Sequence, residues 1–278
     1  MSRLVPAVNA AAMTLGARLQ LHVLSDDAVQ RLERTNFAGR TVSLAGGIAA
    51  AVGALAGVAS AGGRPGLAAV VAVAPAGALG ALDDLGEQPE DRSTKGLRGH
   101  LSALRDGQVT TGFLKLTGIG LAGLAAGTIL AGARGSTRTW RGIADSVASG
   151  ALVAGTANLV NLLDLRPGRA LKAVAAVALP LAVVPGPATS VASGVLGATA
   201  AAAPGDLAES TMLGDTGANA LGAGLGVALA ASPHPAVRLG ALAVVVAGTL
   251  ASERVSFSAV IERTAWLRAL DQAGRRTG

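Results

Sequence analysis

The chain has 278 residues, of which 51% are hydrophobic and 14% are charged, and its mean hydropathy is +0.52. Soluble domains carry about 25% charged residues, so this composition argues against an ordinary soluble protein. The net charge of +6 would suit nucleic acid, but the chain has few aromatic residues for base stacking, and we expect no nucleic-acid partner. Cysteine is absent, which excludes disulfides and thiolate metal sites.

The charges gather in short intervals between long neutral runs of Ala, Gly, Val and Leu. This segregation is typical of a membrane protein with several helical spans, because each span must satisfy its own backbone polar groups in lipid. A soluble Ala-rich bundle is the alternative, but it would need charged helix faces, and residues 41–63 carry no charge. We therefore predict an all-α fold, a polytopic integral membrane helical bundle that forms one domain over residues 1–278.

A spanning helix needs about 20 mostly apolar residues. On this criterion the sequence predicts about nine transmembrane helices, in chain order 4–24, 41–63, 66–82, 112–132, 144–163, 170–186, 188–204, 217–232 and 236–252. The 39 glycines would let such helices approach closely, and by analogy they would also suit a homodimer.

Nine spans place alternate connections on the same side of the membrane. One side then receives the polar intervals and the C-terminal tail, namely residues 25–40, 83–111, 164–169, 205–216 and 253–278. Most of the Lys and Arg residues lie on this side, so the positive-inside rule makes it cytoplasmic. The arginines at 134, 138 and 141 oppose this assignment. Apolar residues spaced along the tail predict a helix at the membrane interface.

The longest polar interval begins with the adjacent carboxylates Asp83 and Asp84, where a hydrophobic run ends. Such a pair could bind Mg²⁺, or act as base or nucleophile toward a phosphate group. Lys95 and Arg98 follow at a spacing that places them on one helix face, where they could hold a diphosphate. His100 is the candidate proton carrier. The alternative is an ordinary interfacial loop with a structural histidine.

A second group of polar residues, Asn158, Asn161 and Asp164, lies near the end of an apolar run and is followed by Arg166. Polar groups at membrane depth are expensive unless they are partnered, so a functional role is the first hypothesis. Helical spacing would let the two amides and the carboxylate line one cavity, with Arg166 supplying charge for a phosphate. The alternative is that the amides bond to neighbouring helices.

The third motif is GDTGAN, from Gly214 to Asn219. Asp215 and Asn219 are four residues apart and share a helix face. Asp215 is a candidate metal ligand, since the flanking glycines allow a ligand to approach closely. A plain N-cap would explain Asp215 but not the whole hexapeptide.

The order of these motifs resembles that of one family over about residues 36–222. The order is Asp-Asp…Lys, then Asn-x-x-Asn-Leu-x-Asp, then Gly-Asp-x-Gly. It is similar to the polyprenyl-phosphate N-acetylhexosamine-1-phosphate transferases, which include phospho-MurNAc-pentapeptide translocase. The resemblance implies a multi-pass enzyme of the bacterial plasma membrane with a cytoplasmic site. Such an enzyme transfers a sugar-1-phosphate from a UDP-sugar to a polyprenyl phosphate and releases UMP, using Mg²⁺ (or Mn²⁺). Its product would serve the synthesis of cell-wall or surface glycans.

The resemblance also implies roles for matching residues. Asp83 and Asp84 match the aspartate pair that acts as base or nucleophile, and Asp215, with help from Asp84, would hold the metal. Gly46 and Gly47 match a glycine pair after the first cytoplasmic loop. Together with the cations noted above, the expected substrate-binding residues are Lys95, Arg98, Asn158, Asn161, Asp164, Arg166 and Asn219.

The chain departs from the family pattern in three ways. The family continues Gly-x-Asp-Gly after the aspartate matched by Asp164, but here residues 165–168 are Leu-Arg-Pro-Gly, so the second aspartate is missing. The translocase's histidine cluster is also absent, and nine spans are predicted rather than ten. These departures predict a divergent branch with another sugar or another phosphoprenyl substrate.

Two alternatives come from other functional classes. A transporter or flippase for a phosphorylated lipid would use Asn158 and Asp164 to line a pathway, but it would need ionisable groups near mid-membrane. A catalytically inactive relative could act as an assembly partner, and the missing second aspartate keeps this alternative open.

Overall fold

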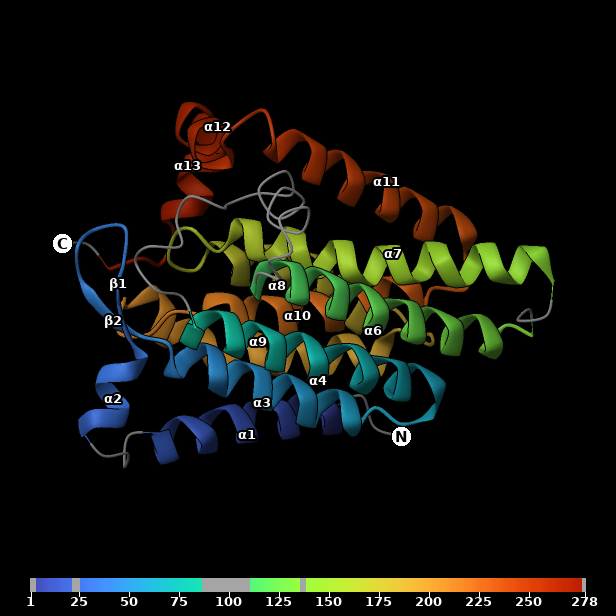
Figure 1. Cartoon of the computed structure of the whole chain (residues 1–278), viewed down its shortest axis with the longest axis horizontal. Helices are drawn as coiled ribbons and strands as arrows, with labels where there is room; N and C mark the ends of the chain where they lie inside the picture. The colour runs from blue at the N-terminus through green and yellow to red at the C-terminus, as the bar shows by residue number, and fades with distance from the viewer. Residues whose placement is uncertain (1–3, 22–25, 87–110, 136–138, 277–278) are drawn as a thin grey trace.

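The neutral runs of the sequence fold as helices packed side by side along the long axis of the molecule (Figure 1). The computed structural model of the chain describes residues 4–21, 26–86, 111–135 and 139–276. The helices are α1 (Leu4–Leu21), α2 (Asp26–Leu32), α3 (Ala45–Ala59), α4 (Gly63–Gly86), α6 (Thr111–Ala133), α7 (Trp140–Leu163), α8 (Arg169–Val183), α9 (Thr189–Leu207), α10 (Gly214–Ala230), α11 (Pro235–Ser252), α12 (Phe257–Arg263) and α13 (Ala265–Gln272). Two short strands, β1 (Glu33–Thr35) and β2 (Thr41–Ser43), form a hairpin.

The predicted all-α architecture is confirmed, and each of the nine expected spans coincides with a helix. Within the described residues, four helices are long and apolar enough to cross a membrane: α4, α6, α7 and α11. The other five are shorter or less apolar; α3 and α8, for example, have 15 residues each. The structure therefore supports a helical membrane protein with four candidate spans, and the number nine stays a prediction.

Helix α10 lies at the centre of the bundle, and nearly all of its residues are buried. Its glycines allow backbones to approach closely: a Cβ added at Gly222 would lie 2.7 Å from the Cα of Ala157, and one at Gly226 would lie 2.7 Å from the Cα of Val153. Lipid tails are as apolar as a helix surface, so the hydrophobic effect does not drive helices together inside a membrane. They associate instead through close packing at small residues. The first turn of α10, which carries Asp215, is therefore held firmly between its neighbours.

The interval 25–40, expected to be a loop, contains α2 and the first strand of the hairpin. Arg34 pairs with Val42 in antiparallel register, and the side-chain oxygen of Asn36 accepts hydrogen bonds from backbone N–H groups inside the turn. Strand β2 also bonds to the chain before α10, since the Met212 N–H donates to the Ser43 carbonyl (2.9 Å). The hairpin leaves no alternating pattern in the sequence, because its strands have only three residues each.

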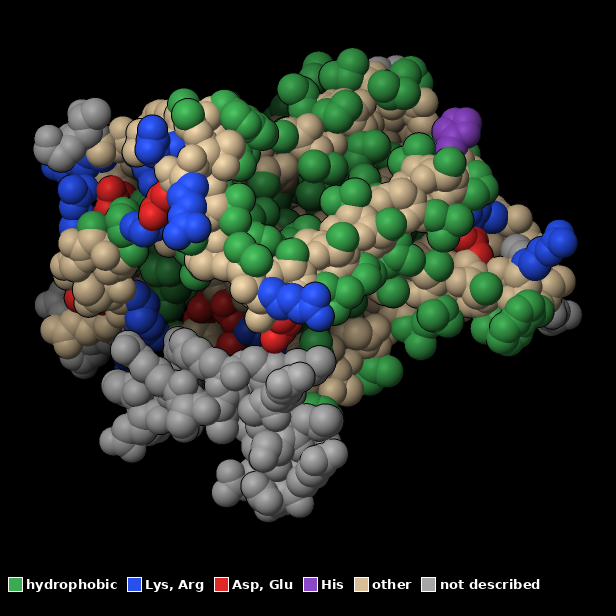
Figure 2. Space-filling model, turned by 90° about the horizontal axis from the view of Figure 1, so that it is seen from above, with side chains coloured by type: hydrophobic (Ala, Val, Ile, Leu, Met, Phe, Trp, Pro, Cys, Tyr) green, Lys and Arg blue, Asp and Glu red, His purple; other side chains and the backbone are tan. Residues whose placement is uncertain are grey.

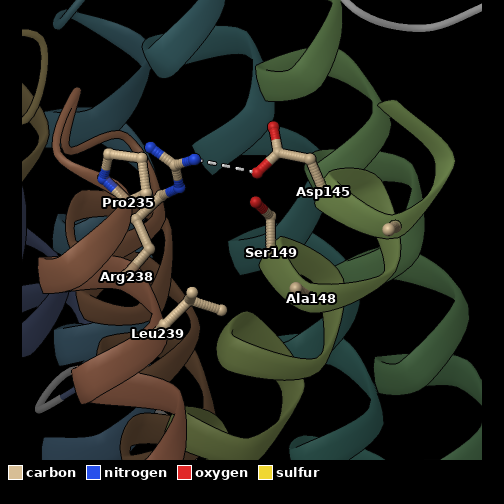
Figure 3. Close-up of a pocket in the computed structure, with 7 residues that line it drawn as sticks. Asp145, Ala148, Ser149, Pro235, Arg238 and Leu239 are labelled. Atoms are coloured by element: carbon tan, nitrogen blue, oxygen red, sulfur yellow. Dashed lines mark hydrogen bonds and ion pairs between the residues drawn. The ribbon is translucent and has the colours of Figure 1, made fainter. Parts of the chain in front are cut away.

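The opposite end of the bundle holds an ion-pair cluster beside a cavity of about 250 Å³ (Figure 3). Asp145 on α7 accepts hydrogen bonds from Arg134, after α6 (2.7 Å), and from Arg238 on α11 (3.0 Å). Arg134 also donates to the Ala230 carbonyl at the end of α10, and Arg238 to the Ser232 carbonyl. Two arginines on the sparsely charged side thus bind a carboxylate and helix-end carbonyls, which accounts in part for their departure from the positive-inside pattern.

Candidate functional site

The ends of α4, α7 and α9 and the beginnings of α6 and α10 meet at the end of the bundle that carries the hairpin. They bring together carboxylates from distant parts of the sequence: Asp83, Asp84, Asp164, Asp206 and Asp215. Figure 2 shows acidic side chains at the floor of a recess on this part of the molecule, with Lys and Arg side chains around it. The recess is the candidate functional site.

Asp84 caps the first turn of α10. Its two carboxylate oxygens accept the N–H groups of Asp215 (3.0 Å) and Thr216 (2.9 Å), and the Thr216 hydroxyl also donates to it (2.6 Å). A carboxylate at a helix N-terminus satisfies orphan N–H groups and interacts favourably with the helix dipole. Arg34 of the hairpin donates to the main-chain oxygen of Asp84 and so holds the end of α4, which carries this carboxylate. Asp84 therefore positions Asp215 from another helix.

Lys115, on the first turns of α6, lies between Asp83 and Asp215. Its ammonium group contacts the Asp83 carboxylate at 2.5 Å and also pairs with Asp215. The two carboxylates lie within hydrogen-bonding reach of each other as well. Two carboxylates thus converge on one position, and the Lys115 ammonium group fills it.

Asp164 follows the last turn of α7 and faces the same carboxylates. Burial, reinforced by the negative charges of Asp206, Asp215 and Asp84, raises the pKa of Asp164 well above its ordinary value. A hydrogen bond from the Gly214 N–H offsets only part of this increase. A positive charge that enters the recess would act against this increase in pKa.

Asp206, at the end of α9, accepts a hydrogen bond from the Gly168 N–H (2.5 Å) and so holds the turn between α7 and α8. Gly168 has a positive φ of +71°, a conformation that side chains rarely adopt. This turn is the segment in which the resemblance expects a second aspartate. A carboxylate does reach it, but from α9.

The remaining residues of the second motif differ in their surroundings. Asn158 and Asn161 are half-buried on the last turns of α7, and neither amide has a hydrogen-bond partner among the described residues. Arg166 stacks over the Phe37 ring, with its guanidinium carbon 4.0 Å from the centroid, and pairs with Glu262 (3.1 Å). The two amides are therefore available to a ligand, whereas Arg166 is engaged by the hairpin turn and α12.

Asn219 is 2% exposed, and its side-chain nitrogen donates to the Asp215 carbonyl (2.7 Å). It therefore supports the turn that carries Asp215 from beneath. Lys95, Arg98 and His100, expected to bind phosphate and carry protons, lie outside the described residues.

Glycines let the site close around these side chains. A Cβ at Gly47 would lie 1.7 Å from the Leu213 carbonyl oxygen, and one at Gly80 would lie 2.3 Å from the Asp215 carbonyl oxygen. Gly214 combines a φ of +56° with a hypothetical Cβ only 2.9 Å from the Asp84 carboxylate. Larger residues at these positions would push α3 and α4 away from the start of α10.

The predicted site residues do not include Lys115 or Asp206. A signal existed for both, since each is a charge at the edge of a long neutral run, where a charge needs a partner. Their partners belong to other helices, however, and only the folded chain identifies them.

In comparisons with known proteins, no family model matches this chain, and no characterised protein matches it.

Proposed function

We propose that this protein transfers a sugar-1-phosphate from a UDP-sugar to a polyprenyl phosphate and releases UMP, at the cytoplasmic face of a bacterial plasma membrane. The observation that carries the proposal is the convergence of Asp83, Asp164 and Asp215 with Lys115 at one end of a membrane bundle. The order of the motifs resembles that of the polyprenyl-phosphate transferases, and these motif residues from separate helices lie at one site.

The donor set fits Mg²⁺. Asp83 and Asp215 present hard carboxylate oxygens toward one position, which the Lys115 ammonium group fills in this structure, so Mg²⁺ would have to displace that group. Among the described residues no group of three or more His, Cys, Asp or Glu side chains is arranged to hold a metal ion. Mg²⁺ is nevertheless usually bound by one or two carboxylates together with substrate phosphates. Held by Asp215, it would neutralise charge on the donor diphosphate.

Asp83 is better placed than Asp84 to act as the base. Both oxygens of Asp84 accept hydrogen bonds from the first turn of α10, so they are committed to the cap of that helix. Asp83, which pairs with Lys115, can accept a proton from the acceptor phosphate. An acceptor oxygen then forms a bond to the sugar-bearing phosphorus, and the bond between that phosphorus and the UMP oxygen breaks. Direct attack by the aspartate is the alternative route, and it would form a covalent intermediate.

Other residues of the chain would bind and orient the substrates. Lys115 would stabilise negative charge that develops on the diphosphate as UMP leaves. Asn158 and Asn161 present amides suited to hydrogen bonds with the donor, and Lys95 and Arg98 are expected to supply further positive charge.

The transporter alternative is less well supported. Among the described residues, the carboxylates of the candidate site lie at helix ends, whereas a transport pathway would need ionisable groups near the middle of the spans. An inactive relative would also be expected to lose some of these carboxylates.

The test incubates purified protein and Mg²⁺ with a panel of UDP-sugars and polyprenyl phosphates, and measures UMP release. We expect release that depends on the lipid acceptor, on one or a few donors, and on the metal. Asp215→Asn should abolish transfer while the protein stays folded in detergent. UMP release by this variant at the wild-type rate would remove the metal assignment, and no release by the wild type across the panel would remove the transferase proposal.

A further inference from the structure

The C-terminal helices α12 and α13 carry an apolar surface that no described part of the chain covers. Trp266 is 64% exposed and Leu270 is 59% exposed, and their spacing of four residues places them on one face of α13. Val260 of α12 is exposed as well. A Trp and a Leu side by side on a short polar helix are costly in water, so this face needs a partner.

The orientation of α13 is fixed by its other face. Asp271 pairs with the buried Arg169 at the start of α8 (2.8 Å), and Arg169 also donates to the Ser258 hydroxyl of α12 (2.9 Å). Lys172 donates to the carbonyls of Leu270 and Asp271. These bonds attach one side of the helix pair to the bundle and leave Trp266 and Leu270 on the outward side.

The helix pair must lie close to the end of a membrane span. α11 is a candidate span, and only 6% of its residues are buried inside the protein, so lipid would surround most of it. It ends at Ser252, and α12 begins at Phe257. The connecting residues 253–256 span at most about 14 Å even when fully extended. Figure 1 shows α12 nearly end-on while the bundle helices run across the view, so α12 runs across the bundle axis.

Three exposed arginines lie on the same segment: Arg254 before α12, Arg263 at the end of α12, and Arg268 on the side of α13 opposite Trp266. Apolar side chains flanked by cations, beside the end of a span, match the chemistry of an anionic lipid surface. We propose that α12 and α13 bind the adjoining leaflet, with Trp266 and Leu270 at the acyl boundary and these arginines on anionic phospholipid headgroups. This proposal is independent of the transfer reaction.

The chain has two Trp residues, so Trp140→Phe leaves Trp266 as the only indole reporter. Trp140 is exposed at the opposite end of the bundle, and the matched variant Trp266→Phe keeps it as the control reporter. The full-length proteins are placed in bilayers of phosphatidylcholine with phosphatidylglycerol, and either lipid is brominated in its acyl chains. Emission is measured with each brominated lipid and with iodide in the aqueous phase.

We expect brominated lipid to remove most of the Trp266 emission, iodide to have little effect, and brominated phosphatidylglycerol to quench more than brominated phosphatidylcholine at equal mole fraction. Arg254→Gln with Arg263→Gln should abolish this preference, whereas Arg141→Gln, an exposed arginine at the other end of the bundle, should retain it. Strong quenching by iodide and none by lipid would overturn the proposal. Shielding from both quenchers would also overturn it, because a protein partner would then cover the face.

Discussion

The two ends of the bundle use charged residues in opposite ways. At one end, Asp145 lies between two arginines, and their guanidinium groups donate to its carboxylate, to a hydroxyl and to helix-end carbonyls. At the other, Asp83 and Asp215 share one lysine, and Asp164 makes no ion pair with any described residue. A cluster whose charges are all paired holds helices together. A group of carboxylates with too few cations can be stabilised further when a cation and a substrate bind. The comparison teaches that the number of charges matters less than their balance.

The largest expected effect comes from removing the shared cation. Lys115→Met keeps the aliphatic length but leaves Asp83 and Asp215 facing each other, and it removes a donor for the developing charge. We expect UMP release to fall about 10²–10³-fold, the usual loss for one such donor. Arg141→Gln serves as the control and should keep the wild-type rate. A Lys115→Met rate within tenfold of wild type would mean that this lysine only balances charge.

Gly80→Ala tests whether close approach of α4 and α10 builds the site. The added Cβ would meet the Asp215 carbonyl oxygen at 2.3 Å, so the helices must separate, at about 1–3 kcal/mol of stability. Gly120→Ala on α6 is the matched control, because no atom lies within 4 Å of its Cβ position. It should be neutral, or stabilise by about 0.5–1 kcal/mol. Thermal unfolding in detergent and UMP release measure both variants, and equal behaviour would contradict this account of the glycine.

Asp145→Asn tests whether the ion-pair cluster at the end opposite the recess contributes to stability but not to activity. It leaves two arginines without their shared counter-ion, and we expect a loss of about 1–3 kcal/mol, since the three side chains keep some exposure. The transfer rate per folded molecule should not change. A variant with normal stability and impaired transfer would reverse the roles that we assign to the two ends.

The smallest expected effect is a pH dependence of the tail. Burial alone would raise the pKa of Asp271, but the hydrogen bond and charge of Arg169, with the charge of Arg275, hold this pKa below its ordinary value. The pKa of Asp271 is lower in the folded protein than in the unfolded chain, so ionised Asp271 stabilises the attachment at pH values above the unfolded pKa. This stabilisation is lost as the pH falls through the folded pKa. We therefore expect the tail to stay attached at neutral pH and to loosen only below about pH 4.

Fluorescence anisotropy of Trp266 in the Trp140→Phe protein reports this loosening. Asp271→Asn in the same background should show low anisotropy at every pH. A wild-type transition near neutral pH would contradict the assignment to Asp271.

Hydropathy and charge spacing were enough to place the long helices but not α2, because only a neutral run of about 15 to 24 residues has few alternatives to a helix. The alternation of connections also placed Asp83, Asp84, Asp164 and Asp215 on the same side, and the structure brings them together. Sequence patterns could not identify α10 as the central helix, since every run is rich in the same small residues. They also missed Lys115 and Asp206, whose partners are 32 to 100 residues away or on another helix.

The capping of α10 by Asp84 has a consequence for biogenesis. The hairpin, the glycine pair of α3 and the end of α4 are all synthesised early, yet each contacts the chain around residues 211–216, which emerges much later. Until that segment leaves the ribosome, the early helices lack the partner that orders them, and a partly made chain has no assembled acidic recess. The acidic recess is therefore complete only after the central helix α10 has been inserted.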